Sequence, residues 1–574
     1  MLNVSALRSS FAAYPSNRFT GPTWAWRRSV LREQTGQNAT CVSCARHAAL
    51  TAKRDSCPWR PSSILKLQSP KRTAMTARSA SSPANRDLLS TSSSRVPPAA
   101  QELVEFINSS WTSYHATATT ARKLEAAGFV RLNERDEWNL IPGGKYFFTR
   151  NMSSIVAFAV GAKYVPGNGI HIIGAHTDSP CPKLKPVSSI TKSGFLEVGV
   201  QTYGGGLWHT WFDRDLSVAG KVVLRRGKES GRLSQELVQV DRPILRIPTL
   251  AIHLDRNVNT EGFRPNVEAH LAPILATAIK GELGFGLTAS CPSENDQDSA
   301  WHEKEKKPAH HPLLLAVLAE ELDCDADEIV DFELEVCDVQ PSVIGGAALE
   351  FIYSGRLDNL ASAFCALKAL LEAGGDGSLE EESGVRMIAM FDNEEVGSGS
   401  VIGAGGTVLA DAINRIIRIL CSNSREEGIF ERSMRNSFLV SADMAHALHP
   451  NYADKHESNH APKLHAGLVI KHNANQRYAT NAVTATLFRE CASRSGIPTQ
   501  DFVVRNDMGC GSTIGPILSA NLGIRTVDVG VPQLSMHSVR EMCGTEDIDI
   551  CYRHFTSFFE NFAAVSSDCN DIDF

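Results

Sequence analysis

Acidic and imidazole side chains recur directly after predicted buried strands of this chain. The stretch 385–400 reads VRMIAMFDNEEVGSGS, so that two adjacent glutamates, Glu394 and Glu395, follow an apolar run that ends at Phe391. Such a pair could form a solvated turn. It could also form a site in which one carboxylate binds a metal ion while its neighbour moves a proton. The residues that follow the other predicted strands decide between these two interpretations.

Five further polar residues lie at strand ends or at the start of a helix. They are His176 and Asp178 after GIHIIGA, Asp443 after SFLVSA, His537 in the loop after IRTVDVG, and Asp358 at the start of a helix in SGRLDNL. In open α/β sheets, ligands bind beyond the carboxyl ends of the strands. Several carboxylates that converge there would repel one another strongly unless a cation neutralised them. The pattern therefore predicts a cation site at one edge of a sheet.

A pair of divalent ions would use the whole set of residues, although each has an ordinary explanation when taken alone. Asp358 by itself, for example, would be interpreted as a helix N-cap. Imidazole together with carboxylate suits zinc or a related first-row metal, and two ions about 3.5–4 Å apart can share one bridging carboxylate. The ligands would be His176, Asp358, Glu395, Asp443 and His537. Glu394 is then left as the base that deprotonates water and passes the proton to a leaving amine, and Asp178 would orient the His176 imidazole.

Two other motifs are weaker candidates. The sequence HESNH at 456–460 matches the HExxH pattern of zinc proteases, which requires a helix, but Pro450 and Pro462 bracket it and indicate a loop. The glycine-rich segments 397–399 and 509–515 lack the spacing of a nucleotide-binding loop. The second segment could still offer helix N-terminal amides to an anionic group of a substrate.

The elements that must position these residues alternate along the C-terminal half of the chain. Predicted helices cover 358–373, 406–420, 481–495 and 513–522, and predicted strands cover 385–391, 437–442, 501–504 and 524–530. Further predictions are two helical segments in 99–129 and short strands between 138 and 176. Strands that alternate with helices imply a mostly parallel sheet covered on both faces. The sequence therefore predicts an α/β fold in which the sheet is flanked by helices.

The chain divides into four expected segments. Residues 1–95 lie outside the fold, 96–185 and 346–574 form the two parts of the α/β domain, and 186–345 is a strand-rich insertion with a helix at 312–322 and a polar loop at 291–312. Because 574 residues exceed what a single small core accommodates, two or more domains are expected.

The N-terminal segment differs in composition from the rest of the chain. Its first 84 residues carry thirteen Lys or Arg against two acidic residues, Glu33 and Asp55. A basic, serine-rich and acid-poor segment is typical of an organelle transit peptide. The alternative is an over-extended gene model, because Met75 opens a plausible shorter start. A transit peptide would indicate a plastid or a mitochondrion, and otherwise we expect a cytoplasmic protein.

The overall composition argues against several classes of function. A net charge of −7 offers no electrostatic footprint for nucleic acid. The apolar stretches are shorter than the roughly 18–20 residues that cross a bilayer. The fourteen cysteines follow no repeating framework, which suits a reducing compartment. We therefore expect a globular protein that binds neither nucleic acid nor a membrane.

Eight long blocks of the sequence follow an order that is typical of one enzyme family. They are AHTDSPCPKLKP, QTYGGGLWHTWFDRDLSVAGKV, SGRLDNL, FDNEEVGS, SADMAHALHPNY, QRYATNAV, NDMGCGSTIGP and PQLSMHSVRE. Together they resemble the aspartyl aminopeptidases of the M18 metallopeptidase family, from about residue 97 to the C-terminus. The resemblance implies a zinc exopeptidase-like α/β fold with an inserted dimerisation and lid domain, and dimers that assemble into a dodecamer.

The resemblance also implies an activity and a role for each site residue. The family removes unblocked N-terminal Asp or Glu from peptides with two zinc ions, one of them exchangeable with Mn²⁺ or Co²⁺. By resemblance, Asp358 bridges the ions, His176 and Asp443 complete one ligand set, and Glu395 and His537 complete the other. Glu394 matches the general base, Asp178 the aspartate behind the ligands, Lys471 the residue that reads the acidic side chain, and His253 a residue inserted from a neighbouring subunit.

Two alternatives to this function stay open. A related co-catalytic metalloaminopeptidase would keep the chemistry and prefer neutral N-terminal residues. A non-catalytic assembly or cargo homologue would keep the fold without turnover. The intact set of ligands and base in this sequence favours an enzyme.

Overall fold

In the computed structural model, the described residues lie within the unit Ser81–Phe574 of the chain. The described residues are 96–226, 231–280, 308–375, 377–422, 424 and 426–568. The predictions made for residues 1–95 and for 291–307 of the polar loop lie outside them. Among the helices of the described ranges, none is long and apolar enough to cross a membrane.

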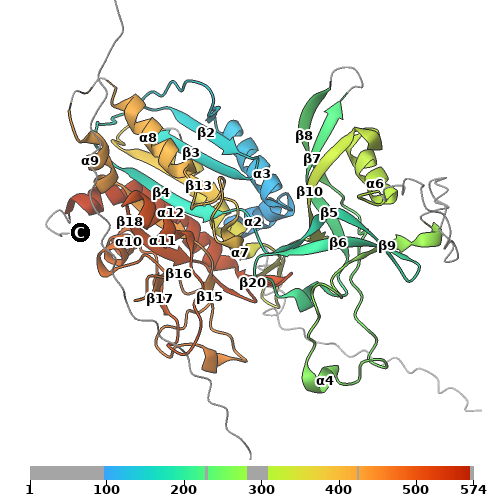
Figure 1. Ribbon diagram of the computed structural model, residues 1–574. Helices are drawn as coiled ribbons and strands as arrows, with labels where there is room; N and C mark the ends of the chain where they lie inside the picture. The colour runs from blue at the N-terminus through green and yellow to red at the C-terminus, as the bar shows by residue number, and fades with distance from the viewer. Residues whose placement is uncertain are drawn as a thin grey trace, which may run out of the picture. The chain divides into compact units, whose positions relative to one another are not determined.

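A nine-stranded sheet forms the core of the α/β part of the unit (Figure 1). Its strands, in spatial order, are β1 (Val130–Arg131), β2 (Lys145–Arg150), β3 (Ser154–Val160), β13 (Val385–Phe391), β4 (Ile170–His176), β14 (Phe438–Ala442), β18 (Arg525–Gly530), β16 (Leu468–His472) and β17 (Thr499–Val503). The central strands β13, β4, β14 and β18 are parallel neighbours. Strand β3 is antiparallel to both of its neighbours, and β16 is antiparallel to β18. The predicted mostly parallel sheet is therefore confirmed.

Helices cover both faces of this sheet, as the alternating pattern predicted. The helices on one face share an apolar cluster; they are α2 (Pro98–Asn108), α3 (Ser113–Ala126), α7 (Leu357–Ala373), α10 (Ala482–Arg494) and α12 (Thr545–Asp568). The other face is covered by α8 (Val408–Leu420), α9 (Ile429–Asn436) and α11 (Ile514–Leu522). Every residue of β4 and β13 is buried, and both strands are mostly apolar, as is typical of strands with helices on both faces.

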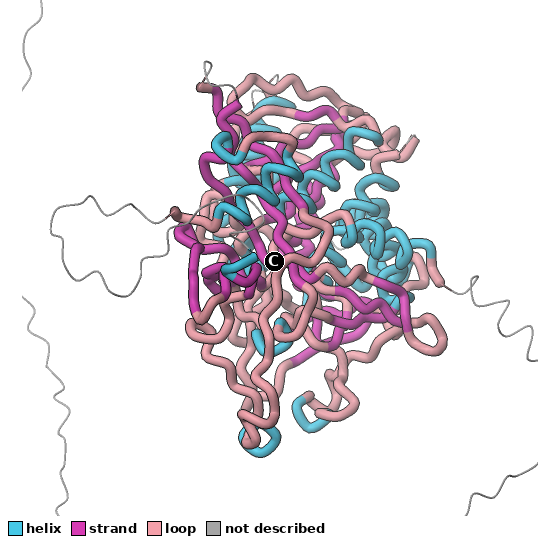
Figure 2. The backbone as a smooth tube through the Cα atoms, turned by 90° about the vertical axis from the view of Figure 1, so that its right-hand side faces the viewer, coloured by secondary structure: helices cyan, strands magenta, loops and turns pink. Residues whose placement is uncertain are grey.

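A second, antiparallel sheet comes from the strand-rich middle of the chain (Figure 1, green). Its spatial order is β8 (Arg232–Gln239), β7 (Leu216–Arg226), β10 (Ile329–Asp338), β5 (Cys181–Lys192), β6 (Phe195–Tyr203) and β9 (Ile274–Thr277). Helix α6 (Pro312–Leu322) packs into its apolar cluster and has the predicted bounds. The long connection between β8 and β9 consists mostly of loop, with the short helix α4 (Val258–Glu261) (Figure 2, pink and cyan).

A third sheet lies in sequence directly beyond the ends of the central strands. It orders β11 (Val343–Gly345), β12 (Phe351–Ser354), β20 (Glu541–Gly544), β19 (Pro532–Leu534) and β15 (Ala445–His446). Strand β15 follows β14 after two residues, and β19 follows β18 after one. Two strands of this small sheet therefore begin at the edge where β14 and β18 end.

Candidate metal centre

Five chain segments bring the predicted ligands to one place. His176 is the last residue of β4, Asp443 follows β14 directly, and Glu395 lies in the short 3₁₀ turn Glu394–Val396 after β13. Asp358 lies at the first turn of α7, and His537 lies between β19 and β20. The ligand atoms of His176, Asp358 and Glu395 all lie within 4.8 Å of one another. The Glu394-Glu395 pair is thus both a turn and part of this cluster.

The two carboxylate oxygens of Asp358 face two different histidines. His176 Nε2 lies 3.3 Å from Asp358 Oδ1 and 3.4 Å from Asp443 Oδ1. His537 Nε2 lies 3.6 Å from Asp358 Oδ2 and 3.4 Å from Glu395 Oε2. The cluster therefore consists of two groups of three side chains that share Asp358.

The donor atoms have the spacing and the bonding that a metal ion requires. Zinc–ligand bonds of about 2.0–2.2 Å at tetrahedral angles place neighbouring ligand atoms about 3.4 Å apart, close to the four distances above. The buried oxygens Asp358 Oδ1, Glu395 Oε1 and Asp443 Oδ1 accept no hydrogen bond from the part of the chain that the structure describes. Because an unpartnered buried oxygen is costly, these residues fit one or two divalent cations.

The electrostatics of the cluster also require positive charge. Burial raises the pKa of Asp358, and the neighbouring Asp443 raises it further. Burial followed by the charge of Asp358 likewise raises the pKa of Glu395 well above its usual range, and burial raises the pKa of Glu394 to about 8. Without a cation these carboxyl groups would tend to hold protons, which is the expected behaviour of like charges brought together in a buried site.

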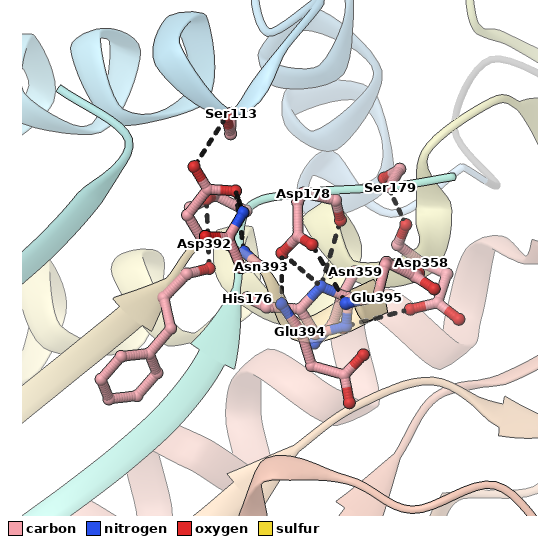
Figure 3. A network of polar contacts seen from close by, with 12 residues as sticks. Ser113, His176, Asp178, Ser179, Asp358, Asn359, Asp392, Asn393, Glu394 and Glu395 are labelled. Atoms are coloured by element: carbon pink, nitrogen blue, oxygen red, sulfur yellow. Dashed lines mark hydrogen bonds and ion pairs between the residues drawn. The ribbon is translucent and has the colours of Figure 1, made fainter. Parts of the chain in front are cut away.

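Asp178 holds both the first histidine and the glutamate turn (Figure 3). His176 Nδ1 lies 3.1 Å from the Asp178 main-chain carbonyl and 3.4 Å from its Oδ1. A carbonyl only accepts, so Nδ1 carries the proton and Nε2 is free to bind a metal. The Asp178 carboxylate accepts from the main-chain N–H of Glu394 at 3.2 Å and of Glu395 at 3.1 Å. Asp178 thus orients the imidazole chiefly through its backbone, while its carboxylate positions the turn.

Glu541 has a corresponding position on the other side of the cluster, and the sequence reasoning missed it. Its side chain is buried at 3% exposure and accepts from the N–H of Asp358 at 3.1 Å and of His537 at 2.8 Å. His537 Nδ1 in turn donates to the Gly205 carbonyl at 3.0 Å. The available signal was a lone acid in PQLSMHSVRE at the start of a short strand, which is too common a feature to single it out.

Lys471 is buried beside the cluster instead of being exposed, as an isolated lysine after a strand usually is. It lies within β16 at 3% exposure, and its Nζ is 3.6 Å from Asp443 Oδ2. Burial by itself would raise the pKa of Asp443, but Lys471 and then His176 hold it well below its usual range. Lys471, Tyr478 and Thr513 line a cavity of about 320 Å³ that also contains the predicted base and four of the predicted ligands.

His253 and the two weaker motifs do not belong to the ligand cluster. His253 is on an exposed loop of the long β8–β9 connection, and no hydrogen bond or ion pair joins it to the described residues of the cluster. The HESNH segment is a loop after the 3₁₀ turn Ala453–Lys455, as its flanking prolines indicated. Both glycine-rich segments line the cavity, 397–399 through Gly397 and Ser398, and 509–515 through Gly511, Ser512 and Thr513.

Comparison with known proteins shows that the chain is similar to members of one enzyme family. The model of one protein family, described as "Aminopeptidase I zinc metalloprotease (M18)", matches residues 106–559 of this chain. A probable aspartyl aminopeptidase of Ricinus communis is 58% identical over 473 residues, which cover 81% of this chain and 96% of that protein. Among solved structures, the Ape4 and Nbr1 complex has a TM-score of 0.76 at 45% identity, covering 83% of this chain and 87% of that one. The mApe1 dodecamer of S. cerevisiae has a TM-score of 0.69 at 29% identity, covering 82% and 99%.

Proposed function

Because the chain belongs to the M18 family of zinc metalloproteases and is a metalloaminopeptidase, we propose that it removes unblocked N-terminal Asp or Glu from peptides. The observation that carries this specificity is the buried Lys471, whose ammonium lies in the same cavity as the acidic cluster. A buried cation of this kind is costly unless it meets an anion. Asp443 Oδ2, 3.6 Å from the Lys471 Nζ, is one such anion, and a substrate side chain that ends in a carboxylate would supply a second one from the cavity.

Two zinc ions per subunit are the second part of the proposal. The shared position of Asp358 between His176 and His537 supports two ions with one bridging carboxylate. Asp443 completes the protein ligands of one ion, and Glu395 completes those of the other. When bound, the ions would polarise the carbonyl of the peptide bond and would lower the pKa of water, so that water could lose a proton near neutral pH. The site near His537 is more exposed, and we propose it as the one that exchanges with Mn²⁺ or Co²⁺.

Glu394 moves the proton in this proposal. It lines the same cavity as Asp358 and Asp443, and no ion pair within 4.0 Å joins it to a histidine anywhere in the described ranges. Its carboxylate is therefore free to take a proton from water and return it to the nitrogen of the leaving amine. Asp178 keeps the Glu394 backbone in place through the hydrogen bond to its N–H.

Assembly into a homo-oligomer is the third part. The related S. cerevisiae mApe1 forms a dodecamer, and we propose that this chain likewise forms dimers that build a dodecamer. The strand-rich segment, expected at 186–345, would act as the dimerisation and lid element. The exposed loop with His253 would reach the cavity of a neighbouring subunit. Light scattering of the purified protein measures the mass, and a monomer at micromolar concentration would contradict this part.

A direct assay of N-terminal release tests the specificity. Zinc-loaded protein is offered peptides that differ only in an unblocked N-terminal Asp, Glu, Leu or Ala, together with an acetylated Asp peptide as the control. We expect release of Asp and Glu and none from the blocked peptide. Met444, Phe502 and Met536 also line the cavity, so preferred release of Leu would support the alternative, a neutral-specificity enzyme. No turnover by zinc-replete protein would support the non-catalytic alternative.

A further inference from the structure

Tyr203 belongs to one sheet, and its hydroxyl bonds to residues that follow two strands of another, β4 and β13. It is the last residue of β6 in the six-stranded sheet. Its hydroxyl donates to Asp178 Oδ2 at 2.6 Å and accepts from Asn393 Nδ2 at 3.0 Å. Both partners lie outside the six-stranded sheet to which β6 belongs. The hydroxyl therefore joins the strand-rich insertion to the two residues that flank and support the Glu394-Glu395 turn.

The bond to Asp178 completes the environment of a buried carboxylate. Asp178 is 2% exposed, and its two oxygens already accept from the N–H groups of Glu394 and Glu395. Removing the Tyr203 hydroxyl would leave Oδ2 with one donor fewer in a buried site, where hydrogen bonds to charged groups are strong. The carboxylate could then rotate, and the two N–H groups that it holds would shift with it.

The bond from Asn393 acts on the same turn from its other side. Asn393 directly precedes Glu394 and has a left-handed backbone, with φ of 63°. Its side chain donates to Tyr203 and accepts from Ser400 Oγ at 2.8 Å. An asparagine tolerates this backbone better than most residues, and side-chain hydrogen bonds help to keep it there. Tyr203 thus contacts both the residue before the turn and the acceptor of the turn's N–H groups.

The ring of Tyr203 is itself held by its own sheet. Lys183 Nζ on β5 lies 3.8 Å from the ring centroid and 3.0 Å from Glu335 Oε1 on β10. A cation over the ring face attracts the π electrons, which makes the phenolic O–H a stronger donor. The ring is thereby attached to a three-strand unit of the insertion, so the hydroxyl has a defined position.

The glycines that follow Tyr203 approach the second ligand group. A Cβ on Gly204 would meet the Glu395 Cβ at 3.1 Å. The Gly205 carbonyl accepts from His537 Nδ1 at 3.0 Å, and Leu207 N donates to the His537 carbonyl at 2.9 Å. The segment Tyr203–Leu207 therefore contacts both the glutamate turn and the histidine opposite it.

From these contacts we infer that Tyr203 is a positioning residue for the proposed base Glu394, acting through Asp178 and Asn393. The inference rests on the proposed function of Glu394. It adds a dependence of turnover on the strand-rich insertion of the same chain. The competing explanation is that Tyr203 only fills space between the sheets, in which case its ring matters and its hydroxyl does not.

Tyr203→Phe separates these explanations because it keeps the ring and removes the hydroxyl. We expect kcat on an N-terminal Asp peptide to fall about 10- to 100-fold, as is common when a residue that supports a metal site is lost. Zinc content should equal that of the parent protein, and KM should change by no more than about twofold, because the substrate contacts are kept. The matched control is Tyr552→Phe on α12, which removes a hydroxyl that donates to the Glu372 carboxylate on α7; its kcat should equal the parent value.

A double-mutant cycle with Asp178→Asn shows whether Tyr203 acts through Asp178. Coupled residues give effects that do not multiply, so adding Tyr203→Phe to Asp178→Asn should reduce kcat by less than Tyr203→Phe does alone. Unchanged kcat in Tyr203→Phe, effects that multiply fully, or a loss explained by unfolded or zinc-depleted protein would each overturn the inference. Failure of the proposed function is distinguishable, because the parent protein itself would then release no Asp or Glu.

Discussion

Replacing Lys471 with methionine tests the origin of specificity most directly. Methionine is also unbranched and flexible and keeps most of the volume, but removes the ammonium that lies 3.6 Å from Asp443 Oδ2. The change has two effects. It removes the cation proposed to bind the acidic side chain of the substrate. It also removes a charge that lowers the pKa of Asp443, which weakens the metal centre for every substrate.

The magnitude follows from the geometry of the cavity. An ammonium and a carboxylate about 4 Å apart interact by about 4 kcal/mol at an effective dielectric constant near 20. Dehydration of both groups offsets part of this, which leaves about 3 kcal/mol, or roughly a 100-fold effect on kcat/KM for an acidic N-terminal residue. The effect through Asp443 is common to all substrates, so it cancels when the kcat/KM for Asp is divided by that for Ala.

The assay therefore compares kcat/KM for otherwise identical peptides with N-terminal Asp and Ala, in the parent protein, Lys471→Met and Lys471→Arg. We expect the Asp/Ala ratio to fall about 100-fold in Lys471→Met. Lys471→Arg keeps the charge and should retain a preference for Asp, although its larger head changes the distance. If Lys471→Met lowers both values in parallel and leaves the ratio unchanged, Lys471 acts only through Asp443 and the reasoning on specificity is wrong.

Three further results are expected. Glu394→Gln should bind zinc like the parent protein and lower kcat by about 10²–10⁴-fold; near-normal turnover with full zinc occupancy would contradict its role as the base. Chelation should make the protein take up protons near neutral pH, because without cations burial raises the pKa of Glu394 to about 8 and raises those of Asp358 and Glu395. Zinc binding would then release these protons, and a binding heat that is the same in buffers of different ionisation enthalpy would refute this. Burial also raises the pKa of Asp547 from 3.8 to about 8, so the folded chain retains a proton that the unfolded chain releases above about pH 4, and stability falls as the pH rises to about 8. Asp547→Asn should remove this contribution to the pH dependence of the unfolding free energy, which is at most about 6 kcal/mol over the whole range from about pH 4 to 8. An unchanged slope of the unfolding free energy between about pH 5 and 8 would contradict this.

The central strands and the candidate ligands were predictable because they leave strong local signals. Strand β13 is an apolar run interrupted only by Arg386, and the structure gives it the predicted bounds Val385–Phe391. Parallel strands end at a common edge, so the polar residues after β4, β13 and β14 could be brought together without knowledge of the strand order. The places of His176 and Glu395 in the cluster follow from that rule, whereas Asp358 was predicted from its position at the start of a helix.

The elements that the sequence reasoning missed have weaker or contradictory local patterns. Strand β16 includes Lys471 and His472, which interrupt its apolar run and suggest a surface segment. Helix α12, Thr545–Asp568, carries a broad aromatic face mixed with polar residues, and it packs against α7 and α10, which lie far from it in sequence. Glu541 and Tyr203 support the site only through contacts between distant segments. No local pattern encodes contacts of that kind.

The place of β13 in the sheet also has a consequence for the synthesis of the protein. Strands β3 and β4 follow one another in sequence, but β13 lies between them and pairs with both. A nascent chain that has not yet reached Val385 therefore carries two strands whose residues are all buried in the finished fold and whose facing edges have no partner. Unpaired apolar edges invite association with other chains. The whole strand-rich segment is translated during this interval, so we expect the nascent chain to depend on chaperones until β13 emerges, and fragments that end before Val385 to aggregate.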